Sequence, residues 1–200
     1  MLPNPKEEKL DPRVKRTRKL ILQSFSELLA EKGFESISVQ DVTEKAQINR
    51  ATFYAHFVDK YKLLDYWISR VFMQEIDKRM LNACHYTPEN LRNLILAVCE
   101  FLSHLHGDCA QPHLQFEALI ESQIKKQIYE LLTVWLQQSK ARISTEIPAT
   151  VATWAIYGLA SHWSHGTPAR AAGAREKQPS LEKFVDEAFP LVAVNLEQFA

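Results

Sequence analysis

The sequence predicts an all-α protein with about nine helices. A three-helix N-terminal domain that contains a helix-turn-helix precedes a larger C-terminal helical bundle. Apolar residues recur at helical spacing along most of the 200 residues, no run alternates as a half-buried strand would, and only five glycines are present. We expect a disordered arm over 1–12, the helix-turn-helix domain over 13–66 and the helical domain over 67–200.

The composition is that of an ordinary soluble protein, with 46% hydrophobic and 24% charged residues. No apolar run approaches the length of a membrane span, and the charged N-terminus lacks the apolar region of a signal peptide. Three scattered cysteines, Cys84, Cys99 and Cys109, do not suggest a disulfide framework. We therefore expect reduced thiols, a cytoplasmic location and no membrane partner.

Charge is unevenly distributed along a chain with no net charge. Lysine plus arginine and aspartate plus glutamate each number 24, but residues 1–62 carry 12 basic against 9 acidic side chains. The N-terminal part is therefore the better candidate for contact with a polyanion.

The first predicted helix spans about 13–32. Pro12 suits a helix start because its missing N–H would lack a partner there anyway. Five cations lie between residues 13 and 19, and apolar residues recur at helical spacing downstream. Gly33 predicts the end of this helix, with Phe34 placed to make the apolar contact that accompanies such a cap.

Two short helices follow, joined by a tight turn. Ser38 is a predicted N-cap with Asp41 three residues later, and Asn49 is the predicted N-cap of the second helix. Phe53 and Phe57, four residues apart, give this second helix an apolar face, whereas its other face is polar. Because such short helices are unstable alone, their packing as a helix-turn-helix whose second helix enters a DNA groove explains the pattern.

The remaining pattern is helical throughout. Asp59 is the predicted cap of a helix that runs to about residue 82, and Pro88 opens another to about residue 104. The apolar pattern after Pro112 is long for one helix, so we expect a break near 120–123. Pro148 opens a further helix, and Ser180 caps a last one in which Pro190 should introduce a kink.

Residues 13–66 resemble the DNA-binding domain of the TetR/AcrR family of transcriptional regulators. After the basic first helix, the resemblance lies in Glu31-Lys32-Gly33-Phe34, Ser38-Val39-x-Asp41-Val42, Ala51-Thr52-Phe53-Tyr54-x-His56-Phe57 and Lys60 with Leu63-Leu64. The chain departs from the family where Thr43 replaces a frequent alanine and Gln47 a frequent glycine. A left-handed conformation at Gln47 would cost about 1 kcal/mol or more.

The resemblance implies a regulator, expected to repress, that binds a pseudo-palindromic double-stranded DNA operator as a homodimer. Arg50 can contact either a guanine edge or a phosphate, and the Ala51 methyl suits a thymine methyl. The hydroxyls of Thr52 and Tyr54 suit phosphates. Backbone N–H groups at helix starts also favour phosphate, whereas His56 suits the DNA backbone or a helix cap. The expected DNA contacts are Arg16, Arg18, Ser38, Thr43, Asn49, Arg50, Ala51, Thr52, Tyr54, His56 and Lys60.

The larger domain should bind a small-molecule effector that releases DNA, and should form the dimer. The 148–163 helix is apolar on almost every side, which favours burial against a second subunit over burial within one monomer. Candidate dimer residues are Trp154, Tyr157, Trp163, Phe184 and Phe189. Candidate pocket residues are Phe101, His113, Phe116, Trp135, Tyr157 and His162.

Two other classes of function remain open from the residues. His104, His106, Asp108, Cys109 and His113 have the chemistry of a metal or thiol sensor or of a metal-dependent enzyme. Their spacing matches no common zinc pattern, so we expect neither a metal nor another cofactor. An enzyme is disfavoured because no phosphate loop, nucleophile elbow or catalytic metal motif is present. The main alternative is a helical adaptor that binds protein rather than DNA.

Overall fold

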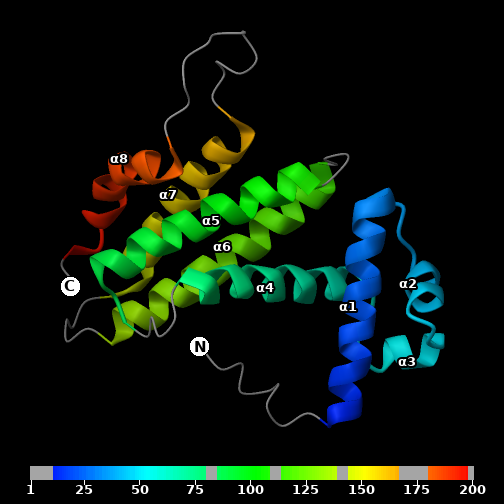
Figure 1. The fold of residues 1–200 in the computed structure, drawn as a ribbon. Helices are drawn as coiled ribbons and strands as arrows, with labels where there is room; N and C mark the ends of the chain where they lie inside the picture. Colours follow the sequence, from blue (N-terminus) through cyan, green and yellow to red (C-terminus); the bar gives the residue numbers. More distant parts are fainter. Residues whose placement is uncertain (1–10, 80–84, 109–113, 139–143, 167–179, 198–200) are drawn as a thin grey trace, which may run out of the picture.

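The computed structural model describes residues 11–79, 85–108, 114–138, 144–166 and 180–197. Within these ranges the chain forms eight helices and no strand, which confirms the predicted all-α class. The helices α1, α2 and α3 gather at one end of the molecule, and α4 leads from them into a bundle of α5 to α8 (Figure 1).

Helix α1 (Pro12–Lys32) begins and ends where local chemistry predicts. The Asp11 carboxylate accepts a hydrogen bond from the backbone N–H of Arg13 at 2.7 Å, and Pro12 occupies the first helical position. Gly33 ends the helix with a φ of 71°, a value at which a side chain would be strained. One face of α1 is buried: Ile21, Leu22, Phe25, Leu28 and Leu29.

Helix α4 (Lys60–Arg79) belongs to both parts of the molecule. Its Asp59 cap accepts from the N–H of Lys62 at 2.7 Å. Near its start, Tyr66 and Trp67 pack on Phe57 and Phe25, with ring centroids 5.5 and 6.2 Å apart. Further along, α4 packs against α5 (Pro88–Asp108) and α6 (Leu114–Gln137). The predicted domain boundary near residue 66 therefore falls inside one continuous helix.

The continuity of helix α6 differs from what the sequence predicts. The break predicted near 120–123 is absent, and one helix spans Leu114–Gln137. Its buried side chains at Ile120, Ile124 and Ile128 keep a spacing of four residues through the predicted break, and no glycine or proline interrupts them. The described residues therefore form eight helices rather than about nine.

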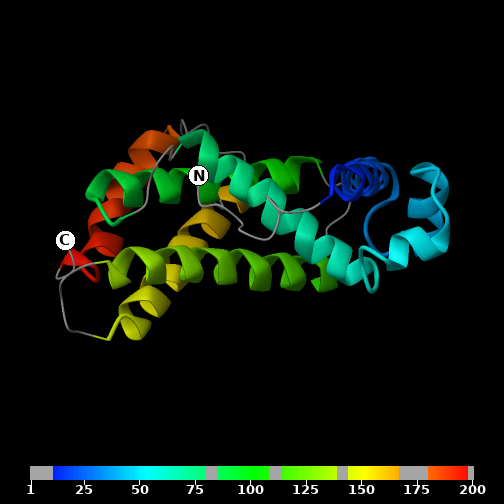
Figure 2. The same cartoon turned by 90° about the horizontal axis from the view of Figure 1, so that it is seen from below.

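Helices α7 (Glu146–His165) and α8 (Leu181–Ala193) complete the bundle. Small buried residues on α7, including Ala149, Ala152 and Ala160, allow close packing on α5. Figure 2 shows α7 crossing α6 obliquely. The Ser180 hydroxyl caps α8 as predicted, accepting from the N–H of Lys183 at 3.3 Å, and α8 continues through Pro190.

Candidate nucleic-acid interface

A capping box fixes the start of α2 (Val39–Lys45), the first helix of the helix-turn-helix. The Asp41 carboxylate accepts from the Ser38 N–H at 2.7 Å and from its hydroxyl at 2.6 Å, while that hydroxyl accepts from the Asp41 N–H. Lys32 of α1 lies 2.7 Å from the other carboxylate oxygen. Hydrogen bonds from Lys32 and then Ser38 hold the pKa of Asp41 well below its usual range.

The turn between the two helices is built on Gln47. Its φ is 54°, the only positive φ of a non-glycine residue in the described ranges, as the sequence predicts. The Gln47 N–H donates to the Glu44 carbonyl at 3.1 Å, and the Ile48 N–H donates to the Thr43 carbonyl at 3.0 Å. These two bonds form a Schellman motif, in which glycine is the usual residue at the left-handed position.

Helix α3 (Arg50–Tyr54) is anchored at both ends. The Asn49 side chain accepts from the Thr52 N–H at 2.7 Å and from the Thr52 hydroxyl at 2.9 Å, which confirms the predicted N-cap. Phe53 is fully buried and packs on Phe57, with ring centroids 6.0 Å apart. The α3 helix is therefore held firmly, although it is too short to be stable alone.

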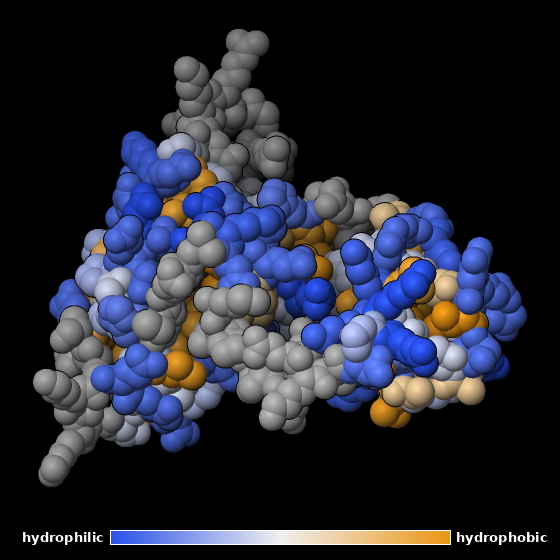
Figure 3. Space-filling view, turned by 60° about the horizontal axis from the view of Figure 1, so that its bottom comes forward, coloured by the Kyte–Doolittle hydropathy of each residue, from blue (hydrophilic) through white to orange (hydrophobic). Residues whose placement is uncertain are grey.

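Three predicted DNA contacts lie on the outward face of α3. Arg50 and Ala51 are exposed, and Tyr54 is 48% exposed although its ring packs edge-on against Phe53. Val58, which the sequence argument did not single out, is 77% exposed just after this helix. Val58 lies outside the apolar stripe of Phe53 and Phe57, and this position in the sequence is the signal that could have identified it as an exposed apolar residue beside α3. Figure 3 shows apolar side chains interspersed with hydrophilic ones at this end of the molecule.

The two predicted arginines of α1 differ in their surroundings. Arg16 is exposed, as a phosphate contact requires. Arg18 is half-buried, with its guanidinium carbon 5.5 Å from the centroid of the Tyr66 ring and its Nε without a hydrogen-bond partner. Partial burial and then the nearby Arg18 charge lower the pKa of His56. His56 is therefore neutral near pH 7 and can donate one N–H rather than act as a cation.

Two predicted phosphate contacts have other roles in the structure. Thr43 is only 4% exposed, and its hydroxyl donates to the Gln40 carbonyl at 2.9 Å, so it is not placed to reach DNA. Lys60 begins α4 as expected, but its ammonium turns inward and donates to three carbonyls at 3.0–3.3 Å, those of Phe34, Glu35 and Ile37. Its side chain therefore holds the segment after α1, and only its backbone N–H remains at the helix start.

The predicted pocket residues occupy different environments. Phe101, Phe116 and Trp135 are buried, and Phe116 stacks on Phe34 with ring centroids 5.7 Å apart, so it joins α6 to the segment after α1. Tyr157 is half-buried, and burial raises its pKa to about 12. His162 is exposed and stacks on Phe184 at 6.3 Å. The assignment of these residues to one pocket stays a prediction, and His113 lies outside the described residues.

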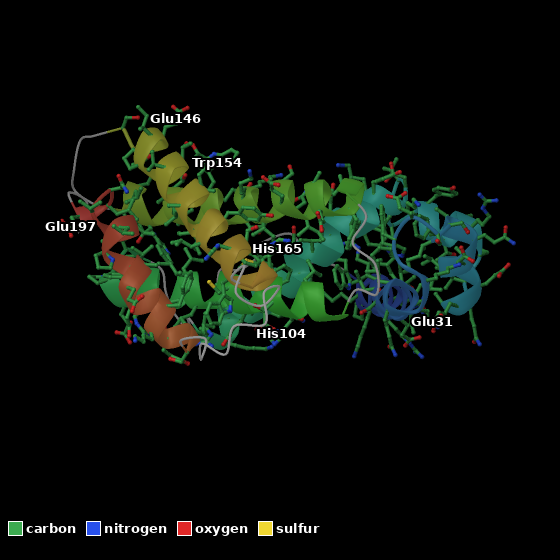
Figure 4. The ribbon with its side chains drawn as sticks, turned by 90° about the horizontal axis from the view of Figure 1, so that it is seen from above. Glu31, His104, Glu146, Trp154, His165 and Glu197 are labelled. Atoms are coloured by element: carbon green, nitrogen blue, oxygen red, sulfur yellow. The ribbon has the colours of Figure 1, made fainter. Side chains whose placement is uncertain are left out.

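The predicted dimer residues lie on α7 and α8. Trp154 is 60% exposed on the outer edge of α7 (Figure 4), and Trp163 packs on Phe184 at 5.1 Å. Phe189 is half-buried. One face of α7 is therefore open to solvent, which argues against the alternative of a helix fully buried within the monomer. The burial of this face against a second subunit stays a prediction.

The metal alternative gains no support from the described part of the chain. His104 lies there, but Cys109, His113 and the His106 side chain lie outside it. Among the described residues, no three metal-ligating side chains gather. No helix in these ranges is long and apolar enough to cross a membrane.

The sequence matches known proteins through the helix-turn-helix. A family model described as bacterial regulatory proteins of the tetR family matches residues 21–66. Over 73 residues the chain is 42% identical to the uncharacterised HTH-type transcriptional regulator YxbF of Bacillus subtilis (strain 168), covering 36% of this chain and 19% of that protein. Over 80 residues it is 31% identical to DhaS, the HTH-type transcriptional activator of the dhaKLM operon of Lactococcus lactis subsp. lactis (strain IL1403). This match covers 40% of this chain and 41% of DhaS. The matches therefore span less than half the length of either relative.

The fold as a whole also has a solved counterpart. The crystal structure of the TetR-family regulator SCO0857 from Streptomyces coelicolor A3 superposes with a TM-score of 0.63, covering 94% of this chain and 98% of that one. Sequence identity is 14%, so this likeness concerns the fold alone.

Proposed function

The N-terminal domain of this chain belongs to the TetR family of bacterial regulatory proteins, and on that premise we propose that the chain is a homodimeric transcriptional regulator that binds an operator through α3. The outward face of α3 carries this proposal. Arg50, Ala51 and Tyr54 are exposed on a helix whose opposite side is fixed by the Asn49 cap and the buried Phe53. A rigid helix with an exposed polar face is what groove recognition requires.

Each exposed side chain has a distinct proposed contact. The Arg50 guanidinium at the first helical position can donate two hydrogen bonds to a guanine edge, a contact worth about 1–3 kcal/mol of discrimination. The Ala51 methyl suits a thymine methyl, and the Tyr54 hydroxyl suits a phosphate. Arg16 on α1 adds a second phosphate contact, which affects affinity but not sequence preference.

The dimer would form through the exposed faces of α7 and α8. Ile147, Val151 and Trp154 follow one another by four and three residues and are all exposed, so they form one apolar face of α7. Leu191 and Val194 are likewise exposed on α8 and directly after it. A symmetric pairing of these faces would place two α3 helices about 34–36 Å apart, one turn of DNA.

Effector control is proposed to act through α6. A small molecule bound in the helical domain that shifts α6 would displace Phe116, and with it the stacked Phe34 at the end of α1. Such a ligand releases DNA only if it binds the displaced conformation more tightly. We propose repression relieved in this way. The Lactococcus lactis relative is named as an activator, and a reporter gene behind the selected operator distinguishes activation from repression.

Selection of binding sites from random-sequence DNA tests the proposal. The wild-type chain should enrich one pseudo-palindromic sequence, and Arg50→Ala or Tyr54→Phe, which keeps the ring packed on Phe53, should weaken its binding without lowering the melting temperature. Lys126→Ala, which removes an exposed cation from α6, is the control and should bind normally. Normal operator binding by both α3 variants would refute the assignment.

A further inference from the structure

We propose that Gln47 determines operator specificity, with its side-chain amide reading a base edge beside α3. This inference rests on the proposed DNA-binding function. It starts from an unusual backbone: in the described ranges, Gln47 is the one non-glycine residue with a positive φ.

The fold requires that backbone conformation but not that side chain. The Schellman motif at the end of α2 uses only the N–H groups of Gln47 and Ile48. Among the described residues, the Gln47 amide makes no hydrogen bond, so nothing within the described chain uses it. A side chain larger than glycine is strained in this conformation, and such strain concentrates at functional sites.

The Gln47 side chain is also exposed, close to the start of α3. Its neighbours Ala46 and Ile48 pack into the domain core, whereas Gln47 is exposed. Gln47 lies two residues before Asn49, so its Cα is within about 7 Å of the N-cap of α3. The N-terminal residues of a recognition helix are the ones that contact base edges, and Gln47 lies close to them along the chain.

The chemistry of an amide side chain suits hydrogen bonding to a base edge better than contact with a phosphate. One carbonyl acceptor and one N–H donor match the N6 and N7 positions of adenine in the major groove. Because the side chain is uncharged, it should add little to the salt-dependent attraction to phosphate. The expected target is therefore an adenine just outside the bases read by Arg50.

The test compares Gln47→Gly with wild type on the selected operator and on operators with each base pair replaced in turn. Glycine suits the left-handed backbone, so this variant removes the amide without disturbing the turn. Gln47→Ala removes the amide but keeps the strain, and Gln137→Ala removes an exposed amide at the far end of α6 as a control.

Wild type and Gln137→Ala should lose about 5- to 150-fold in affinity when the adenine in each half-site is replaced, the range for one bidentate contact. Both Gln47 variants should bind the original and the replaced operators equally. Retained discrimination would overturn the proposal, as would a uniform loss on every sequence, which indicates a phosphate contact or an altered turn. If the wild-type chain selects no operator, that result refutes the proposed DNA-binding function rather than the role of Gln47.

Discussion

Replacing Lys60 by methionine separates a structural role from a DNA contact. In the structure, the ammonium donates to the carbonyls of Phe34, Glu35 and Ile37 at 3.3, 3.2 and 3.0 Å. It also lies 4.7 Å from the centroid of the Phe34 ring. Methionine keeps most of the aliphatic chain but removes the charge and all three donors.

The expected cost follows from these contacts. A hydrogen bond to a charged group contributes about 1.5–3 kcal/mol. The three bonds share one ammonium, and water can replace part of them at the surface, so Lys60→Met should lower the free energy of unfolding by about 2–3 kcal/mol. For a chain of this size, the melting temperature should fall by about 4–12 °C.

Lys62→Met is the matched control. Lys62 lies two residues later on the same helix, its side chain is 65% exposed, and its ammonium pairs with the Asp65 carboxylate at 3.0 Å. An exposed pair of this kind contributes about 1 kcal/mol or less. Thermal unfolding and a mobility-shift titration at two salt concentrations should be run on both variants.

The refuting result is specific. An unchanged melting temperature for Lys60→Met, with weaker operator binding and a shallower salt dependence, would show that the ammonium contacts phosphate rather than the Phe34–Ile37 segment.

Three further predictions each rest on the surroundings of one side chain. The lowered pKa of Asp41 means that its carboxylate stabilises the folded state above the unfolded pKa of about 3.9, and that this stabilisation is lost as the pH falls. In urea unfolding, the free energy of unfolding that Asp41→Asn loses relative to wild type should therefore be constant from pH 5 to 7 and shrink below about pH 4. Cys99 is fully buried with its pKa raised to about 12, so mass spectrometry should find it unalkylated by iodoacetamide at pH 8 unless urea is present. Phe116→Leu removes the ring stacked on Phe34, so scanning calorimetry should resolve two transitions, and one unchanged transition would exclude this contact as a link between the domains.

Local signals predicted the helix-turn-helix closely. The caps at Ser38, Asn49 and Asp59 depend on hydrogen bonds within three residues, so the sequence contains all the information needed. The left-handed turn at Gln47 is predictable for the same reason, because a Schellman motif involves only the preceding turn of helix.

Contacts between distant segments were not predictable. The inward turn of Lys60 depends on carbonyls more than twenty residues earlier, and the stacking of Phe116 on Phe34 joins α6 to the segment after α1. Thr43 was assigned to DNA from its position on α2, whereas its burial depends on how α2 packs on α1. The continuity of α6 also depends on packing, because length alone suggested a break.

The spacing of two recognition helices on DNA tests the central claim most directly. A hydroxyl-radical footprint of the wild-type chain on its selected operator should show two equivalent protected half-sites with centres about 10–10.5 base pairs apart, or a multiple of this. Arg50→Ala should give no footprint at the same concentration. A single protected site, or protection that the Arg50 variant reproduces, would contradict a symmetric dimer that reads DNA through α3.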